Sequence, residues 1–153
     1  MTSPSSNSEH AAATQTIYVF RHAEKVASKP DPELSEMGQQ RAENLAKLLK
    51  NAEIQHTYAT KYQRTQQTAQ PLAKQSQQAI TTYAAGDTVG LVQQVRAHGQ
   101  TTLIVGHSNT VPDIVRALGG TAPELTESDY GDLFVVHINQ RQVTTLRLYV
   151  AAN

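Results

Sequence analysis

The sequence predicts an α/β fold, a three-layer sandwich with a mostly parallel sheet and a C-terminal edge hairpin. Two short runs rich in apolar and β-branched residues, 16–20 and 101–105, are typical of buried parallel strands. Segments with helical spacing of apolar residues alternate with these runs, which favours a doubly wound arrangement. Two last apolar runs, 133–139 and 143–150, flank a short polar turn and predict an antiparallel hairpin.

Length and composition limit the function classes. The chain has 153 residues, enough for one domain with its own core, and 13 basic residues balance 13 acidic ones. We therefore expect no nucleic-acid partner and no attraction to an anionic membrane surface. No cysteine is present, which rules out a disulfide framework, a thiolate nucleophile and a zinc–thiolate site. No apolar run is long enough to cross a bilayer.

Residues 1–15 are rich in Ser, Thr, Ala and Asn and predict a disordered leader, followed by a single domain at 16–153. The leader lacks the basic and apolar regions of a signal peptide. We expect a cytoplasmic protein from the sequence as written, or an exported one if a signal was removed ahead of Met1. Nothing in the sequence fixes the oligomeric state.

Local sequence signals predict where the helices and strands begin and end. Ser35 is suited to cap a helix that extends to about Asn51, with Glu36 in its first turn. Pro71 is expected to kink the next helix or mark its restart. Gly119-Gly120 ends the last helix. By the same reasoning, the other elements are strands at 54–60 and 79–83 and helices at 63–75, 88–98 and 111–118.

Charged side chains follow several predicted strands. Arg21 and His22 come directly after the first strand, Arg64 follows the second, and His107 comes after Gly106. Because the carboxyl ends of parallel strands share one edge of a sheet, we expect these groups to surround one crevice. Guanidinium groups bind phosphate with a planar fork of donors, so the crevice suits a dianion.

Alternatives remain for each group taken alone. Arg64 on an exposed helix face is an ordinary solvated charge, and His107 is equally an ordinary strand-end histidine. A carboxylate would also suit the arginines. A metal site is disfavoured because the two histidines lack a third His or a carboxylate at ligand spacing. The convergence of all four groups on one edge favours an anion site.

The motifs resemble the histidine phosphatase superfamily, the group related to phosphoglycerate mutases. The resemblance extends over most of the chain from Thr16 to the final strand. Ala23 replaces the family's usual Gly, and no long insertion after Tyr83 supplies the acid of the mutases. The compact form is therefore more similar to the small phosphatases, including those that act on protein phosphohistidine. The matching blocks are Arg21-His22-Ala23-Glu24, Leu34 to Gly38, Thr60 to Ala69 and Gly106-His107-Ser108.

The resemblance implies that His22 is the nucleophile, with a pKa depressed by Arg21, Arg64 and a charged His107. The same cations would stabilise the transferring phosphoryl group without a metal or another cofactor.

Four further residues are candidates. Asp87 is the candidate general acid, with helix capping as its alternative; Glu24 is a second acid candidate that is better suited to bracing an Arg or His. Ser28 stands where the mutases carry a phosphate-binding Asn. Asn109 is expected to contact phosphate or to cap a helix.

We therefore expect a metal-independent phosphatase that acts through a covalent phosphohistidine on a phosphorylated small molecule or a phosphoprotein. The alternatives are a non-catalytic phosphate-binding or interaction module with the same pocket, and a phosphomutase. Selectivity would come from residues 25–33 and 121–132, neither of which carries a recognisable ligand motif.

Overall fold

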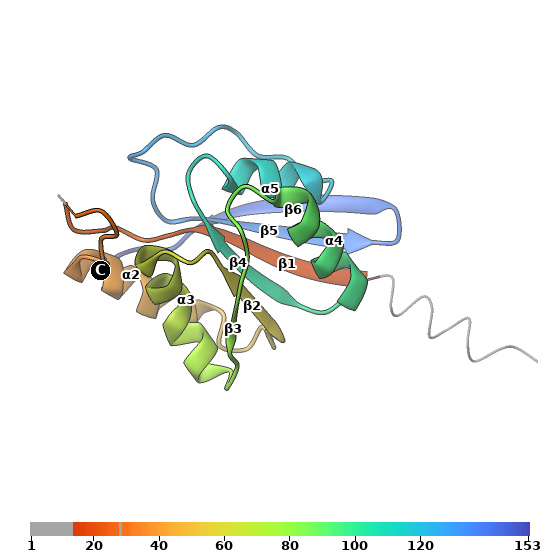
Figure 1. Cartoon of the computed structure of the whole chain (residues 1–153). Helices are drawn as coiled ribbons and strands as arrows, with labels where there is room; N and C mark the ends of the chain where they lie inside the picture. The colour runs from red at the N-terminus through yellow and green to blue at the C-terminus, as the bar shows by residue number, and fades with distance from the viewer. Residues whose placement is uncertain (1–13, 28) are drawn as a thin grey trace, which may run out of the picture.

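A computed structural model describes residues 14–27 and 29–153. Six strands form one sheet in the order β3-β2-β4-β1-β5-β6, and four helices pack on it (Figure 1). In chain order the elements are β1 (Thr14–Arg21), α2 (Glu36–Leu48), β2 (His56–Ala59), α3 (Gln63–Gln75), β3 (Ile80–Thr82), α4 (Thr88–His98), β4 (Thr102–Gly106), α5 (Val111–Ala117), β5 (Asp132–Asn139) and β6 (Gln142–Tyr149).

The pairing confirms the predicted fold class. Strands β1, β2, β3 and β4 are mutually parallel, whereas β5 pairs antiparallel with β1 and forms the edge hairpin with β6. None of the helices in the described part of the chain is both long and apolar enough to cross a membrane.

Two apolar layers hold the sandwich together. In Figure 1, α4 and α5 lie on one side of the sheet, and α2 and α3 lie on the other. Alternation along the strands supplies both layers, since Ile17 and Val19 pack beneath α4 and α5 while Phe20 points to the opposite side. In β4, Ile104 joins the first layer and its two neighbours join the second.

One local prediction needs correction, and one of two alternatives is excluded. β1 begins at Thr14, so the last two residues of the predicted leader belong to the sheet; the rest of the leader lies outside the described residues. The Gln15 amide explains the early start, because it donates to the carbonyls of Val95 (3.0 Å) and Gln100 (2.9 Å). In addition, α3 continues past Pro71 as one helix, without the restart considered from the sequence.

The topology creates a crevice at one edge. β1 and β4 are neighbours, yet the chain leaves β1 toward α2 on one face and leaves β4 toward α5 on the other (Figure 1). In open α/β sheets, ligands bind where adjacent strands diverge in this way, outside their carboxyl ends. His22 and His107 come directly after these two strands.

Candidate active site

The carboxyl ends of β1 and β4 bring two histidines together. Arg21 is paired with Gly106 in the parallel ladder, and the backbone N–H of His22 extends the pairing by donating to the Gly106 carbonyl (2.8 Å). His107 is the next residue on β4's side. The two imidazole rings lie with their centroids 5.5 Å apart and their planes at 66°. Both rings are almost fully buried.

The His22 ring has a defined tautomer. Its Nδ1 lies 2.8 Å from the Ala23 carbonyl oxygen, which can only accept, so Nδ1 carries the proton. Nε2 then holds the lone pair, and it has no hydrogen-bond partner within residues 14–27 and 29–153. The backbone beside the ring is tied to α3, because Ala23 N–H donates to Thr68 Oγ1 (2.9 Å) and that hydroxyl donates to the Arg64 carbonyl (2.7 Å). His22 is therefore a rigidly held, neutral imidazole with Nε2 as its nucleophilic atom.

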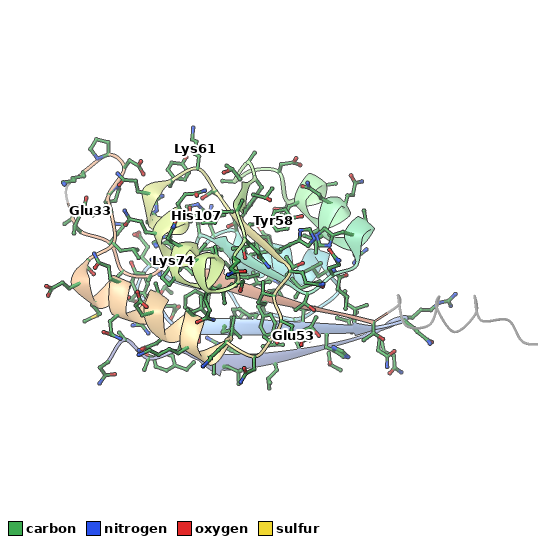
Figure 2. The ribbon with its side chains drawn as sticks, turned by 90° about the horizontal axis from the view of Figure 1, so that it is seen from below. Glu33, Glu53, Tyr58, Lys61, Lys74 and His107 are labelled. Carbon is green, nitrogen blue, oxygen red and sulfur yellow. The ribbon has the colours of Figure 1, made fainter. Side chains whose placement is uncertain are left out.

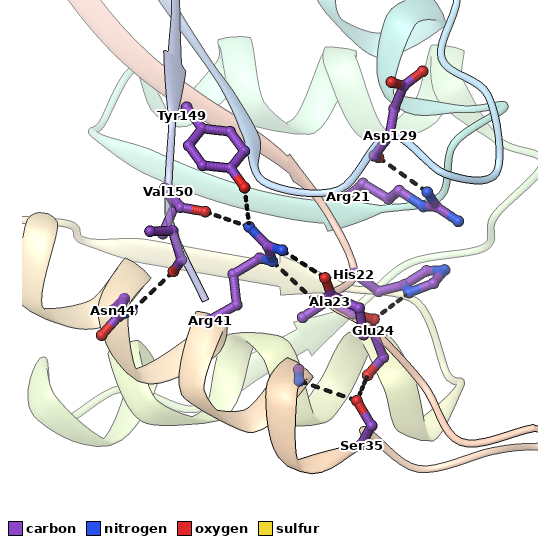
Figure 3. Close-up of polar contacts among 12 residues, drawn as sticks. Arg21, His22, Ala23, Glu24, Ser35, Arg41, Asn44, Asp129, Tyr149 and Val150 are labelled. Atoms are coloured by element: carbon purple, nitrogen blue, oxygen red, sulfur yellow. Dashed lines mark hydrogen bonds and ion pairs between the residues drawn. The ribbon is translucent and has the colours of Figure 1, made fainter. Parts of the chain in front are cut away.

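Arg21 is held by the loop before β5. Its Nη1 lies 2.9 Å from the Glu127 carbonyl, 3.0 Å from the Asp129 carbonyl and 3.3 Å from the Thr126 carbonyl. The guanidinium also lies 3.9 Å from the centre of the Tyr130 ring, and this ring is 6.1 Å from that of His22. Figure 3 shows Arg21 reaching toward this loop. The acceptors are neutral dipoles, so the positive charge is oriented without being paired to a carboxylate.

Arg64 comes from the first turn of α3 and lies 4.7 Å from the centre of the Tyr62 ring. In contrast, Lys61 extends outward from the end of β2 (Figure 2). In the described part of the chain, the buried side-chain atoms without a hydrogen-bond partner are Arg21 Nε and Arg64 Nε. Buried donors in native proteins are nearly always paired, so these two indicate that a ligand acceptor completes the site.

Burial and positive charge keep both histidines neutral. Burial, followed by the charges of Arg21, His107 and Arg64, lowers the pKa of His22 to about 3, against a smaller opposing effect of the Ala23 carbonyl. Burial and the two arginines lower the pKa of His107 to about 4. A charged His107 lowers the pKa of His22, as the sequence analysis expected, whereas burial and the two arginines favour the neutral form of His107 itself when no anion is bound.

Glu24 braces the site from the second layer of residues (Figure 3). Its carboxylate accepts from Arg41 Nε (2.9 Å) and Nη2 (2.5 Å), and Arg41 Nη1 donates to the Val150 carbonyl (2.5 Å). The Glu24 carbonyl accepts from the Ser35 backbone N–H (2.9 Å). A Cβ on Gly38 would overlap this carbonyl oxygen, so glycine is required for the close approach of α2. The pair with Arg41 also holds Glu24 as a carboxylate, with its pKa below the usual range.

A cavity of about 450 Å³ opens beside His107 and Arg64. Asn109 lines it, so the expected contact with phosphate stays a prediction, and Asp113 supplies a carboxylate to its wall. The other lining residues are Tyr62, Ala85, Gly86, Thr88 and Thr110.

Of the predicted site residues that the structure describes, Arg21, His22 and Asp87 do not line this cavity. Ser28 lies outside the described residues. Asp87 is exposed and caps α4 by accepting from the Gly90 N–H (3.0 Å), while its neighbours Gly86 and Thr88 line the cavity. The capping alternative is thus realised, and the acid role stays a prediction. Across the described ranges, no cluster of three or more His, Asp or Glu residues is arranged to hold a metal ion.

Sequence reasoning missed several groups that shape the site. Tyr62 and Tyr130 cover the two guanidinium groups, and the buried hydroxyls of Thr60, Thr65 and Thr68 support the histidines and α3. The threonines had a usable signal, since Thr65 and Thr68 lie three residues apart on α3 and Thr60 comes directly after β2, all in the block that contains Arg64. Tyr130 had none, because it reaches the site from a loop distant in sequence.

The chain is similar to known phosphatases. Residues 17–85 match a family profile described as Histidine phosphatase superfamily (branch 1). No curated protein sequence matches the chain. Among solved structures, the protein histidine phosphatase SixA complexed with tungstate is 16% identical with a TM-score of 0.72, and the match covers 88% of this chain and 96% of that one.

Two further structures extend the comparison. A SixA protein from Agrobacterium tumefaciens, described as a phosphohistidine phosphatase, is 20% identical with a TM-score of 0.64 over 87% of this chain and 97% of its own. A mycobacterial glucosyl-3-phosphoglycerate phosphatase with inorganic phosphate is 14% identical with a TM-score of 0.67 over 89% and 97%. At these identities the likeness shows a shared fold, and the substrate has to be argued from the site.

Proposed function

Because residues 17–85 match the histidine phosphatase superfamily (branch 1), we propose that the chain is a metal-independent phosphatase acting through a covalent phosphohistidine on His22. The observation that carries the proposal is the pair of buried, unpartnered guanidinium nitrogens of Arg21 and Arg64 beside a neutral imidazole. Phosphate or tungstate is present in two of the similar phosphatase structures, which supports a phosphorylated substrate.

The first chemical step uses the Nε2 lone pair of His22. Nε2 forms a bond to phosphorus while the bond from phosphorus to the leaving oxygen or nitrogen breaks, and the Nδ1–H···O=C bond to Ala23 stabilises the charge that develops on the ring. Arg21 and Arg64 stabilise the equatorial phosphoryl oxygens. Water then attacks phosphorus, the P–N bond breaks, and neutral His22 is restored with release of phosphate.

The leaving group decides how much acid catalysis is needed. Asp87 is engaged as a helix cap, and the carboxylate in the cavity wall is that of Asp113. A substrate whose leaving group departs without a strong acid, such as a phosphoramidate or an aryl ester, suits this arrangement. We therefore favour phosphohistidine or an activated phosphomonoester as the substrate class.

The test uses p-nitrophenyl phosphate with EDTA present. We expect turnover that survives chelation, and a loss of about 10⁴-fold or more in His22→Asn. Arg64→Ala should lose about 10²–10³-fold, as for one oxyanion donor. His137→Gln, at the opposite end of the sheet, is the matched control and should keep full activity. A base-stable phosphorylated protein should accumulate in wild type and be absent from His22→Asn.

The rival function is a phosphate-binding module without turnover, which the capping role of Asp87 favours. It predicts that wild type binds inorganic phosphate but hydrolyses neither p-nitrophenyl phosphate nor phosphoramidate. That outcome would reject the enzyme and keep the anion site.

A further inference from the structure

A line of buried hydroxyls lies behind His107. Its Nε2 is 2.9 Å from Thr60 Oγ1, and Thr60 Oγ1 is 2.8 Å from Thr65 Oγ1. The Thr65 hydroxyl in turn lies 2.9 Å from the Thr60 carbonyl and 3.0 Å from the Tyr62 carbonyl. Both threonine side chains are at most 1% exposed, so water does not compete for these contacts.

The two carbonyls give the line a direction. A carbonyl oxygen can only accept, so the Thr65 hydroxyl must donate to one of them. Thr65 Oγ1 can then only accept from Thr60, and the Thr60 hydroxyl oxygen must accept from the ring. Consequently His107 Nε2 carries a proton, and the lone pair of the neutral ring is on Nδ1. That nitrogen has no hydrogen-bond partner within the described ranges.

We propose that Thr60 and Thr65 are positioning residues that fix His107 as the Nε2–H tautomer, so that Nδ1 takes up a proton when a phosphoryl anion binds. The inference rests on the proposed function and adds to it how the second histidine is prepared. With the anion bound, both ring N–H groups have acceptors: Thr60 Oγ1 behind the ring and the anion in front.

The surroundings make this uptake conditional on the ligand. Positive charge and burial keep the ring neutral when no anion is bound. An anion offsets the cations and favours the imidazolium. The proton comes from water or from the substrate monoanion and is released with phosphate. The titratable or charged groups around the ring are Arg21, Arg64, His22 and Tyr62, with Asp113 in the wall of the adjoining cavity.

Removal of the Thr60 hydroxyl should weaken the binding of inorganic phosphate. Thr60→Val leaves Nε2–H buried without an acceptor, which penalises the imidazolium more than the neutral ring. We expect the affinity for phosphate to fall about 10- to 100-fold near pH 8, because this is the change that the typical free energy of a hydrogen bond to a charged group corresponds to. The defect should shrink as the pH is lowered, because protons then become easier to supply. Thr60→Ser keeps the hydroxyl and should restore affinity.

The matched control is Thr57→Val. Thr57 lies on β2, three residues before Thr60, is equally buried and uses its hydroxyl on Gln78, with no hydrogen bond to His107. It should lose stability to a similar degree while phosphate affinity and its pH dependence stay at wild-type values. Thr65→Val should also lower the affinity for phosphate, but less than Thr60→Val does. The Thr60 hydroxyl is still present to accept from His107 Nε2, although its own proton no longer has Thr65 Oγ1 as a fixed acceptor.

Two measurements decide the proposal. Heteronuclear NMR of wild type labelled on histidine should show His107 protonated on Nε2 without phosphate and on both nitrogens with phosphate. A neutral ring protonated on Nδ1 would overturn the proposal, whether or not the protein hydrolyses p-nitrophenyl phosphate. Calorimetry of phosphate binding across about pH 5.5–8 should give the losses above. A folded Thr60→Val with wild-type affinity at every pH would also overturn it.

Discussion

Acid should destabilise the folded protein through its two facing imidazoles. In the unfolded chain His22 and His107 have pKa values near 6.5, whereas in the folded protein their pKa values are about 3 and about 4. The unfolded state therefore binds more protons between these values. Stability from these groups is complete above pH 6.5 and is lost as the pH falls toward the folded-state values.

The size of the effect follows from the pKa values. Between about pH 7 and about pH 5 each histidine becomes protonated in the unfolded chain only, which lowers the free energy of unfolding by about 2 kcal/mol per ring and about 4 kcal/mol for both. This is a large part of the stability of a domain of this size, so wild type should unfold at clearly lower urea concentration at the lower pH.

The assay is urea unfolding of wild type, His22→Gln, His107→Gln and the double variant at both pH values. Each substitution should reduce the acid-induced loss of unfolding free energy by about 2 kcal/mol. For every variant, this loss is the difference between its own values at about pH 7 and about pH 5. Variants that lose as much stability as wild type on acidification would refute the burial of neutral imidazoles. Saturating phosphate should reduce the loss in wild type and leave that of the double variant unchanged, because a bound anion raises the pKa values of the two rings.

Three substitutions test the supports of the site. Gly38→Ala should lower the free energy of unfolding by about 1–3 kcal/mol through overlap with the Glu24 carbonyl; Gly86→Ala, whose added Cβ meets nothing within 4 Å, should be neutral in the same urea titration. Arg41→Met breaks a largely buried ion pair and should cost about 3–5 kcal/mol, and a melting temperature equal to wild type would contradict this role. Tyr130→Leu should weaken phosphate binding by about 1 kcal/mol through loss of the ring over the guanidinium, whereas calorimetry of Tyr130→Phe should show little change.

The sequence was sufficient for the fold class, the edge hairpin and the family because each has a local or periodic signal. Strand ends also led to Arg21, His22, Arg64 and His107, which the structure gathers around one crevice. The end of the leader was misplaced because a side-chain contact from Gln15, 80 residues distant from its partner Val95, extends the strand.

Other parts of the site could not have been predicted. The acceptors that orient Arg21 are backbone carbonyls, and any residue type supplies a carbonyl. The charge state of His107 depends on how deeply the ring is buried, which the order of residues along the chain does not give. The sequence allowed Asp87 to be either a general acid or a helix cap. The capping contact depends on where the Gly90 N–H lies, which only the structure gives.

The loop 126–129 holds Arg21 through main-chain carbonyls, so this function does not depend directly on which side chains the loop carries. Thr126 and Asp129 secure the turn through their side chains, since the Asp129 carboxylate accepts from the Thr126 N–H (2.7 Å). The hydrogen bond from the guanidinium to position 127 goes to the main-chain carbonyl, and the Glu127 side chain acts on Arg21 only through its charge. A different side chain at that position can therefore change the outer surface of the loop while the hydrogen bond that holds the arginine persists.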